Sequence, residues 1–196
     1  IGNLNNVRYR HDGKVVGLGY DGRIHLLTDT DGDGLEDKTE FFWDQRTLRG
    51  PIGMALTAKD DPRGDGVFVA SKGKVSFILD KDRDGRADEE KVIATGWPES
   101  FHSVDTLGVA VDPKDGSIYF GLGCANFVDA YVIDKATGRS HYKLEDIRGT
   151  IQRISADFST RETICTGVRF TCALAFNRHG DLFATDQEGA TWLSNG

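Results

Sequence analysis

Short apolar runs separated by glycine turns recur along the chain. Four times, an apolar strand is followed by a turn glycine and a second apolar strand. Repeats of about 40–50 residues that each hold some four short strands are typical of a β-propeller. No stretch sustains the 3.6-residue period of an amphipathic helix, so we expect little helix. The four copies occupy residues 7–20, 53–71, 107–123 and 172–186.

We therefore predict an all-β fold, in which residues 1–196 form a portion of a single β-propeller domain with about three and a half four-stranded blades. A long insertion that begins near Cys124 is expected to follow the second strand of the third blade. Rings of 4–8 blades are known, so the remaining blades are expected outside this chain unless two copies complete each other. The expected blades are roughly residues 1–46, 47–100, 101–168 and a partial blade at 169–196.

Two acidic loops interrupt the strand pattern. The first follows the D-x-D-x-D-G spacing that supplies calcium with oxygen ligands, with Gly34 at the sharp turn. Residues 22–27 and 38–43 on either side read as strands, which predicts a β-hairpin tip rather than a helix–loop–helix site. The alternative is a solvated acidic turn that binds nothing. The candidate ligands are Asp29, Asp31, Asp33, the Leu35 carbonyl, Asp37 and, at the twelfth position, Glu40.

The second acidic loop repeats the pattern between two further strand-like segments, with Gly85 at the turn. Lys91 replaces the acid at the twelfth position, so this loop is expected to bind calcium more weakly or to complete the ligand shell with Asp88 and water. The candidate ligands are Asp80, Asp82, Asp84, the Arg86 carbonyl and Asp88.

Composition narrows the function classes. The formal net charge is −7, and two bound Ca²⁺ would offset more than half of it. No basic patch indicates nucleic acid as a partner, and no apolar run reaches a membrane span of roughly 20 residues. The chain starts at Ile1, which we interpret as a portion of a longer protein. A Cys165–Cys172 disulfide is possible, although free buried cysteine is also common.

Several segments resemble a known family. Residues 107–123, residues 149–192 and the TDTDGDG hairpin are similar to the six-bladed propeller of the soluble quinoprotein glucose/sorbosone dehydrogenases. The nearest likeness is to the branch of membrane-bound dehydrogenase domains of large secreted bacterial proteins. The resemblance implies pyrroloquinoline quinone (PQQ) and Ca²⁺ as cofactors, a sugar or alcohol as substrate, a haem-c domain as electron acceptor and an extracytoplasmic location.

The same resemblance assigns roles to individual residues. His102 matches the general base that takes the proton of the substrate hydroxyl, a role that suits the pKa of an imidazole. Arg169 matches the quinone-binding arginine, which stabilises negative charge on the reduced quinone. Gly189 and Ala190 match the carbonyl ligands of a calcium beside the quinone.

The sequence also departs from the family. Phe170 stands where the family has asparagine, and Cys124 and Ala125 replace a polar pair that lies near the substrate. These departures favour the competing hypothesis, a non-catalytic calcium-stabilised propeller that binds carbohydrate or protein. The charged runs at residues 59–65 and 143–148 are expected to be solvated.

Overall fold

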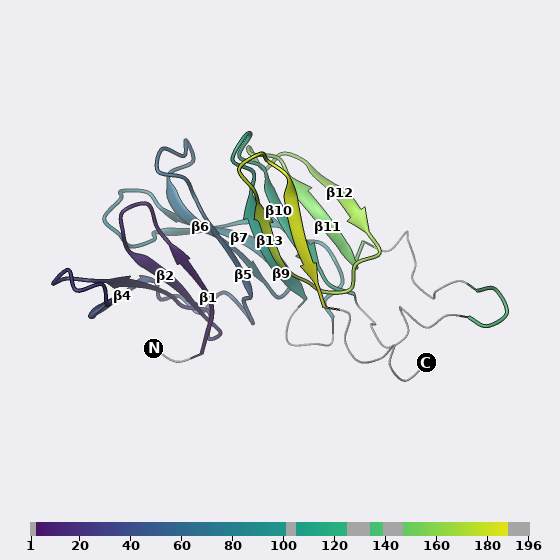
Figure 1. The fold of residues 1–196 in the computed structure, drawn as a ribbon, viewed down its shortest axis with the longest axis horizontal. Coiled ribbons are helices and arrows are strands. Elements are labelled where there is room, and N and C mark those ends of the chain that lie inside the picture. Colours follow the sequence, from purple (N-terminus) through teal and green to yellow (C-terminus); the bar gives the residue numbers. More distant parts are fainter. Residues whose placement is uncertain (1–2, 101–104, 125–133, 139–146, 188–196) are drawn as a thin grey trace.

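The computed structural model describes residues 3–100, 105–124, 134–138 and 147–187. These residues form fourteen strands, and the described part of the chain contains no helix, so none that could cross a membrane. The predicted all-β propeller-type fold is confirmed (Figure 1). The strands are β1 (Leu4–Tyr9), β2 (Val15–Gly19), β3 (Ile24–Thr28), β4 (Lys38–Trp43), β5 (Gly53–Leu56), β6 (Asp65–Ser71), β7 (Lys74–Asp80), β8 (Glu89–Ala94), β9 (Thr106–Val111), β10 (Ile118–Leu122), β11 (Thr150–Ile154), β12 (Arg161–Thr166), β13 (Thr171–Phe176) and β14 (Leu182–Asp186).

Each sheet is an antiparallel meander of consecutive strands. Strands β1–β4, β5–β8 and β9–β12 form three four-stranded sheets, and β13 and β14 form a two-stranded sheet. The long connection after β10 does not interrupt its sheet, because β10 pairs with β11 in register from Ile118–Ile154 to Leu122–Thr150. The three four-stranded sheets follow one another across Figure 1. The expected residue boundaries of the blades and the closure of a ring stay predictions.

The sheets are held together by side chains between them. The middle of strand β6, residues 67–70, is apolar at every position because both of its faces are covered. Val67 and Val69 pack toward the first sheet, whereas Phe68 and Ala70 pack toward the third. A strand buried on both faces needs apolar residues at every position rather than at alternate ones.

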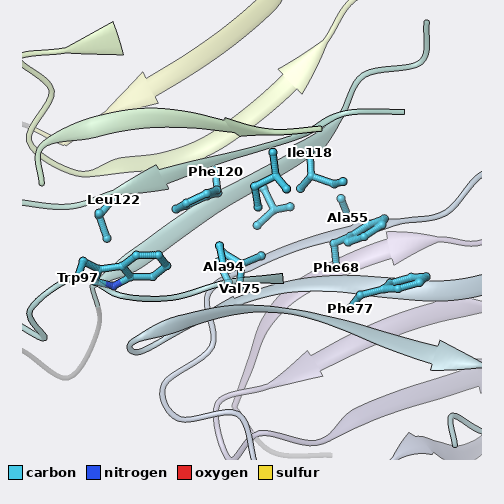
Figure 2. Close-up of a cluster of buried hydrophobic side chains, with 12 residues drawn as sticks. Ala55, Phe68, Val75, Phe77, Ala94, Trp97, Ile118, Phe120 and Leu122 are labelled. Carbon is cyan, nitrogen blue, oxygen red and sulfur yellow. The ribbon is translucent and has the colours of Figure 1, made fainter. Parts of the chain in front are cut away.

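The largest of these contacts lies between the second and third sheets (Figure 2). Phe68 and Phe77 stack with ring centroids 4.5 Å apart, and Trp97 packs against Phe120 at 5.6 Å. The buried members of this cluster are Ala55, Phe68, Ala70, Val75, Phe77, Ala94, Trp97, Val109, Ile118, Phe120, Leu122 and Ile154.

The first strands of successive sheets lie close together. Strand β5 contacts β1 and β9, and β9 contacts β13. Glycine permits this approach, since a Cβ on Gly53 would lie 1.9 Å from the carbonyl oxygen of Leu107. Gly108 permits the same approach between β9 and β13, because its Cβ would lie 3.0 Å from backbone atoms of Ala173.

One expectation from the sequence was wrong here. The run at residues 59–65 is not fully solvated, because Asp61 is buried and pairs with Arg63. The Arg63 guanidinium lies 4.9 Å from the ring centroid of Phe68 and donates to the Gly116 carbonyl at 2.8 Å. The Asp61–Arg63 pair therefore connects the second sheet to Gly116 in the turn that precedes β10.

Candidate functional site

Residues 123–124, just after β10, join the starts of β9 and β13. The amide of Gly123 donates to the Asp105 carbonyl at 2.8 Å, and the amide of Cys124 donates to the Arg169 carbonyl at 2.9 Å. The segment that follows β14 reaches the same place, because the Gln187 amide donates to the Phe170 carbonyl at 2.9 Å. Four chain segments, at Asp105, residues 123–124, residues 169–170 and Gln187, are therefore joined by backbone hydrogen bonds at one edge of the sheets.

Arg169 lies at this meeting point and is only 6% exposed. Its Nη1 donates to the Gln187 carbonyl at 2.9 Å, and its guanidinium lies 5.4 Å from the ring centroid of Phe170. Asp186 accepts hydrogen bonds from the amides of Arg169 and Phe170, at 2.9 and 2.8 Å. Asp186 thus fixes the backbone that carries the arginine, a role that the sequence analysis missed.

Phe170 fills the space beside residue 123. It is buried, and a Cβ on Gly123 would lie 2.8 Å from its Cε1 atom. At the position where the quinoprotein dehydrogenases that the sequence resembles have asparagine, the aromatic ring therefore packs against a glycine backbone. It supplies no polar group at this position.

The cysteines near this edge are thiols. Cys124 is buried, and its Sγ donates to the Val168 carbonyl at 3.4 Å. Cys172 and Cys165 are both free, so the possible disulfide between them is not formed. Burial raises the pKa of the Cys172 thiol, so it is protonated at neutral pH.

A buried ion pair supports the start of β9. Asp105 is 0% exposed and Arg148 is 2% exposed, with Oδ2 and Nη1 3.4 Å apart. Asp105 Oδ1 also accepts from the Gly73 amide at 3.0 Å, and Arg148 Nη1 donates to the Pro98 carbonyl at 2.8 Å. The prediction that the run at 143–148 is solvated was wrong for Arg148, because Asp105 provides its buried partner.

His102, Gly189 and Ala190 lie outside the described residues. His102 precedes Asp105 by three positions, and Gly189 follows Gln187 by two. Residues 123–124 bond to the backbone of Asp105 and Arg169, and Gln187 bonds to the backbone of Phe170, the residue after Arg169.

The first acidic loop joins β3 to β4 and is largely exposed. Asp29, Asp31 and Asp33 each place an oxygen within 4.8 Å of the others. The amides of Gly34 and Gly32 donate to Asp29 and lower its pKa.

The remaining candidates of the first loop are more dispersed. Asp37 accepts from the hydroxyl and amide of Thr30, which lower its pKa, and is not part of the three-acid cluster. Leu35 is 70% exposed, and Glu40 pairs with Lys38 on β4.

The second acidic loop joins β7 to β8 and is anchored at a buried residue. Asp80 is 1% exposed, and an oxygen of it lies within 4.8 Å of oxygens of Asp82 and Asp88. Its Oδ2 accepts from the Gly85 amide at 2.9 Å, while burial raises its pKa. Asp84 Oδ1 accepts a hydrogen bond from the Arg86 amide at 2.7 Å, and Asp84 lies outside the three-acid cluster.

The two loops share one backbone turn. Their fourth and sixth positions both have positive φ, at Gly32 (81°) and Gly34 (88°) in the first loop and at Arg83 (61°) and Gly85 (93°) in the second. A non-glycine residue adopts this conformation at a cost. The shared turn therefore follows from the acid spacing rather than from glycine alone.

Solved structures with a similar fold are PQQ-type and glucose dehydrogenases. The holo PQQ domain of pyranose dehydrogenase from Coprinopsis cinerea is 14% identical with a TM-score of 0.69, and the match covers 93% of this chain and 44% of that one. The calcium structure of a carbohydrate-active enzyme of family AA12 from Trichoderma reesei is 13% identical with a TM-score of 0.70, covering 94% and 45%. A putative oxidoreductase (glucose dehydrogenase) from Thermus thermophilus is 19% identical with a TM-score of 0.65, covering 93% and 56%.

These likenesses show the fold, and the chain spans about half the length of each of the three proteins. A search of curated protein sequences finds no match. The sequence itself matches one family over residues 5–195. The chain belongs to the family described as a domain of unknown function, DUF7133.

Proposed function

We propose that this chain is a portion of an extracytoplasmic PQQ-type dehydrogenase propeller that oxidises a sugar or another alcohol. The observation that carries the proposal is the junction at residues 123–124, whose amides donate to the carbonyls of Asp105 and Arg169. One of the two acceptors is Arg169 itself, and the other, Asp105, follows His102 by three positions in the sequence. The holo PQQ domain and the glucose dehydrogenase among the similar folds support the same activity.

The described residues fit a quinone cofactor through Arg169. Its guanidinium is a buried cation held in place by the Gln187 carbonyl, and PQQ is an anion. Bound PQQ supplies a quinone carbon that accepts hydride from the substrate. Arg169 would hold the bound quinone and place a fixed positive charge beside it, which is most effective in a buried site.

The other roles in the proposal fall on His102, Gly189 and Ala190. His102 would remove the proton of the substrate hydroxyl, and the carbonyls of Gly189 and Ala190 would hold a calcium beside the quinone. A haem-c domain would accept the electrons. These assignments rest on the family resemblance.

Substitution of Arg169 tests the cofactor site directly. In the full-length protein, Arg169→Ala should weaken PQQ binding about 10-fold or more, as expected for loss of a charged hydrogen bond. Arg153→Ala is the matched control, because Arg153 forms surface ion pairs with Asp115 and Glu162 on the third sheet. Quenching of intrinsic fluorescence by PQQ measures both affinities. Equal PQQ affinities in the two variants would show that Arg169 does not contact the cofactor.

His102→Ala separates proton transfer from cofactor binding. Turnover should fall by about 10²–10⁴-fold, the usual contribution of a general base, with little change in PQQ affinity. Dye reduction over a panel of sugars measures turnover. The dehydrogenase proposal fails if the intact protein binds no PQQ and shows no activity that depends on His102.

The alternative is a non-catalytic, calcium-stabilised propeller that binds carbohydrate or protein. The packing of Phe170 against Gly123 favours it, because no polar side chain is presented where the family has one. The buried Cys124 points to the same conclusion. Retention of carbohydrate binding by a protein that does not bind PQQ would support this alternative.

Both candidate functions include calcium bound at the two acidic hairpins. In the first loop, the clustered oxygens of Asp29, Asp31 and Asp33 form the start of a ligand shell, which Asp37, the Leu35 carbonyl and Glu40 would complete. Asp31→Ala should abolish calcium binding by this loop, as measured by calorimetry. No calcium binding by the unsubstituted protein would refute both sites.

A further inference from the structure

We propose that the second acidic loop, residues 80–88, is a calcium-dependent clamp that joins the second sheet to the first. This inference deepens the calcium proposal and does not depend on PQQ binding or on dehydrogenase activity. The two acidic loops share a sequence pattern, but among the residues that the structure describes only the second has a buried carboxylate and a hydrogen bond to the neighbouring sheet.

The buried carboxylate is that of Asp80. The residue is 1% exposed, its Oδ2 accepts from the Gly85 amide, and its Oδ1 has no hydrogen-bond partner among the described residues. A buried carboxylate oxygen without a partner is strongly unfavourable. Oxygens of Asp82 and Asp88 lie within 4.8 Å of an Asp80 oxygen, so a divalent cation among them would give Asp80 the missing ligand.

Nearby basic side chains do not replace the cation. Arg10 acts on Asp80 only through its charge, because its Nε and Nη2 donate to the two oxygens of Asp12. Lys91, which occupies the twelfth position of the loop, has its Nζ 4.9 Å from the ring centroid of Phe158. Three clustered carboxylates with no basic partner at the twelfth position favour a hard cation over an ion pair.

The loop ends against the first sheet. The Ala87 amide donates to the Phe42 carbonyl on β4 at 2.8 Å, and Ala87 packs against the core between the first two sheets. The adjacent Asp88, a candidate ligand, donates its own amide to the Leu79 carbonyl on β7. Asp88 would bind the cation and is hydrogen-bonded to β7, while its neighbour Ala87 is hydrogen-bonded to β4. Release of the cation would therefore loosen the contact between Ala87 and β4.

The first loop has no such connection among the residues that the structure describes. Its acids beyond Asp29 are all exposed, and the amides of Asp33 and Leu35 donate to oxygens of Asp31 and Asp33 within the loop itself. A cation there would order a hairpin tip without changing the contact between sheets. This contrast makes the first loop an internal control for the second.

Hydrogen exchange in the full-length protein, with Ca²⁺ or with a chelator, tests the clamp. Ca²⁺ should slow exchange in peptides that contain Ala87, by about 100-fold at 100 times Kd, because the opening reaction must release the ion. A peptide from β11 in the third sheet should not respond. Calorimetry on the same samples gives the number of ions bound.

Two matched variants locate the effect. Asp82→Asn removes one exposed ligand of the second loop, and should abolish the calcium response at Ala87 while the first loop still binds one ion. Asp31→Asn should abolish calcium binding by the first loop and leave the response at Ala87 unchanged. Asp80→Asn, which removes the buried charge itself, should also abolish the response.

The proposal is overturned by any of three results. Ca²⁺ leaves exchange at Ala87 unchanged in the unsubstituted protein, Asp82→Asn retains the response, or Asp31→Asn removes it. PQQ binding by these variants is measured separately, so failure of the clamp and failure of the dehydrogenase proposal are distinguishable.

Discussion

Asp105→Asn tests the ion pair beneath the candidate site. Asp105 is completely buried and accepts hydrogen bonds from the Gly73 amide and the Thr106 hydroxyl as well as from Arg148. Asparagine has nearly the same shape and retains one carbonyl oxygen, so packing and one amide contact are preserved. The variant mainly removes the negative charge from beside a guanidinium that is 2% exposed.

Burial rather than distance sets the expected magnitude. The Arg148–Asp105 atoms are 3.4 Å apart, whereas Arg153 and Asp115 on the surface are only 2.7 Å apart, with side chains 29% and 46% exposed. Coulomb attraction at equal dielectric would make the surface pair the stronger one. Loss of one partner from a buried pair, however, costs about 3–5 kcal/mol, whereas an exposed pair contributes about 0.2–1 kcal/mol.

Urea unfolding of Asp105→Asn and of the control Asp115→Asn measures both free energies. We expect the first variant to lose several times more stability than the second, without a change in the slope of the transition. Equal losses, or a larger loss in Asp115→Asn, would contradict the argument that burial dominates.

Three further predictions concern the sheets and their turns. Phe68→Ala should lower the free energy of unfolding by about 3–5 kcal/mol in urea denaturation, because Phe68 is fully buried between two sheets. Gly53→Ala should cost about 1–3 kcal/mol or more in the same assay, since its Cβ would meet the Leu107 carbonyl oxygen at 1.9 Å. The hydrogen bond from Arg10 lowers the pKa of Asp12 from 3.8 to about 2, so its stabilising contribution is complete above the unfolded pKa and is lost as pH falls through the folded value. Thermal melts from pH 5 to pH 2 should therefore show a smaller loss of stability in Asp12→Asn than in the unsubstituted protein.

The strands and hairpins could be predicted from the sequence because their signals are local. Apolar runs such as residues 67–70 lie beside turn glycines, and β6 and β7 accordingly pair in register from Asp65–Asp80 to Ser71–Lys74. The contacts between sheets were not predictable in the same way. Trp97 meets Phe120 only through the packing of two separate repeats, and nothing in either repeat specifies the partner.

The polar residues of the candidate site show the same division. Arg169 was found through its match to a family motif, whereas Asp186 and the Asp105–Arg148 pair were missed. Arg148 and its partner are 43 residues apart, and Asp186 caps an amide 17 residues before it. Neither spacing is a recognisable motif. An arginine in a run of charged residues is more often solvated than buried, and only the fold shows the exception.

The two acidic loops show where sequence pattern reaches its limit. By ligand count the first loop is the better calcium site, because Glu40 occupies its twelfth position and Lys91 occupies that of the second. The structure adds a different consideration, the environment of the first aspartate. Asp29 has backbone amides for both of its oxygens, whereas Asp80 is buried with one oxygen unpartnered among the described residues. A cation therefore removes a larger unfavourable interaction at Asp80, although fewer protein ligands are available to hold it. Ligand number alone predicts tighter binding at the first loop, and the burial of Asp80 predicts a larger stabilisation of the fold by the second.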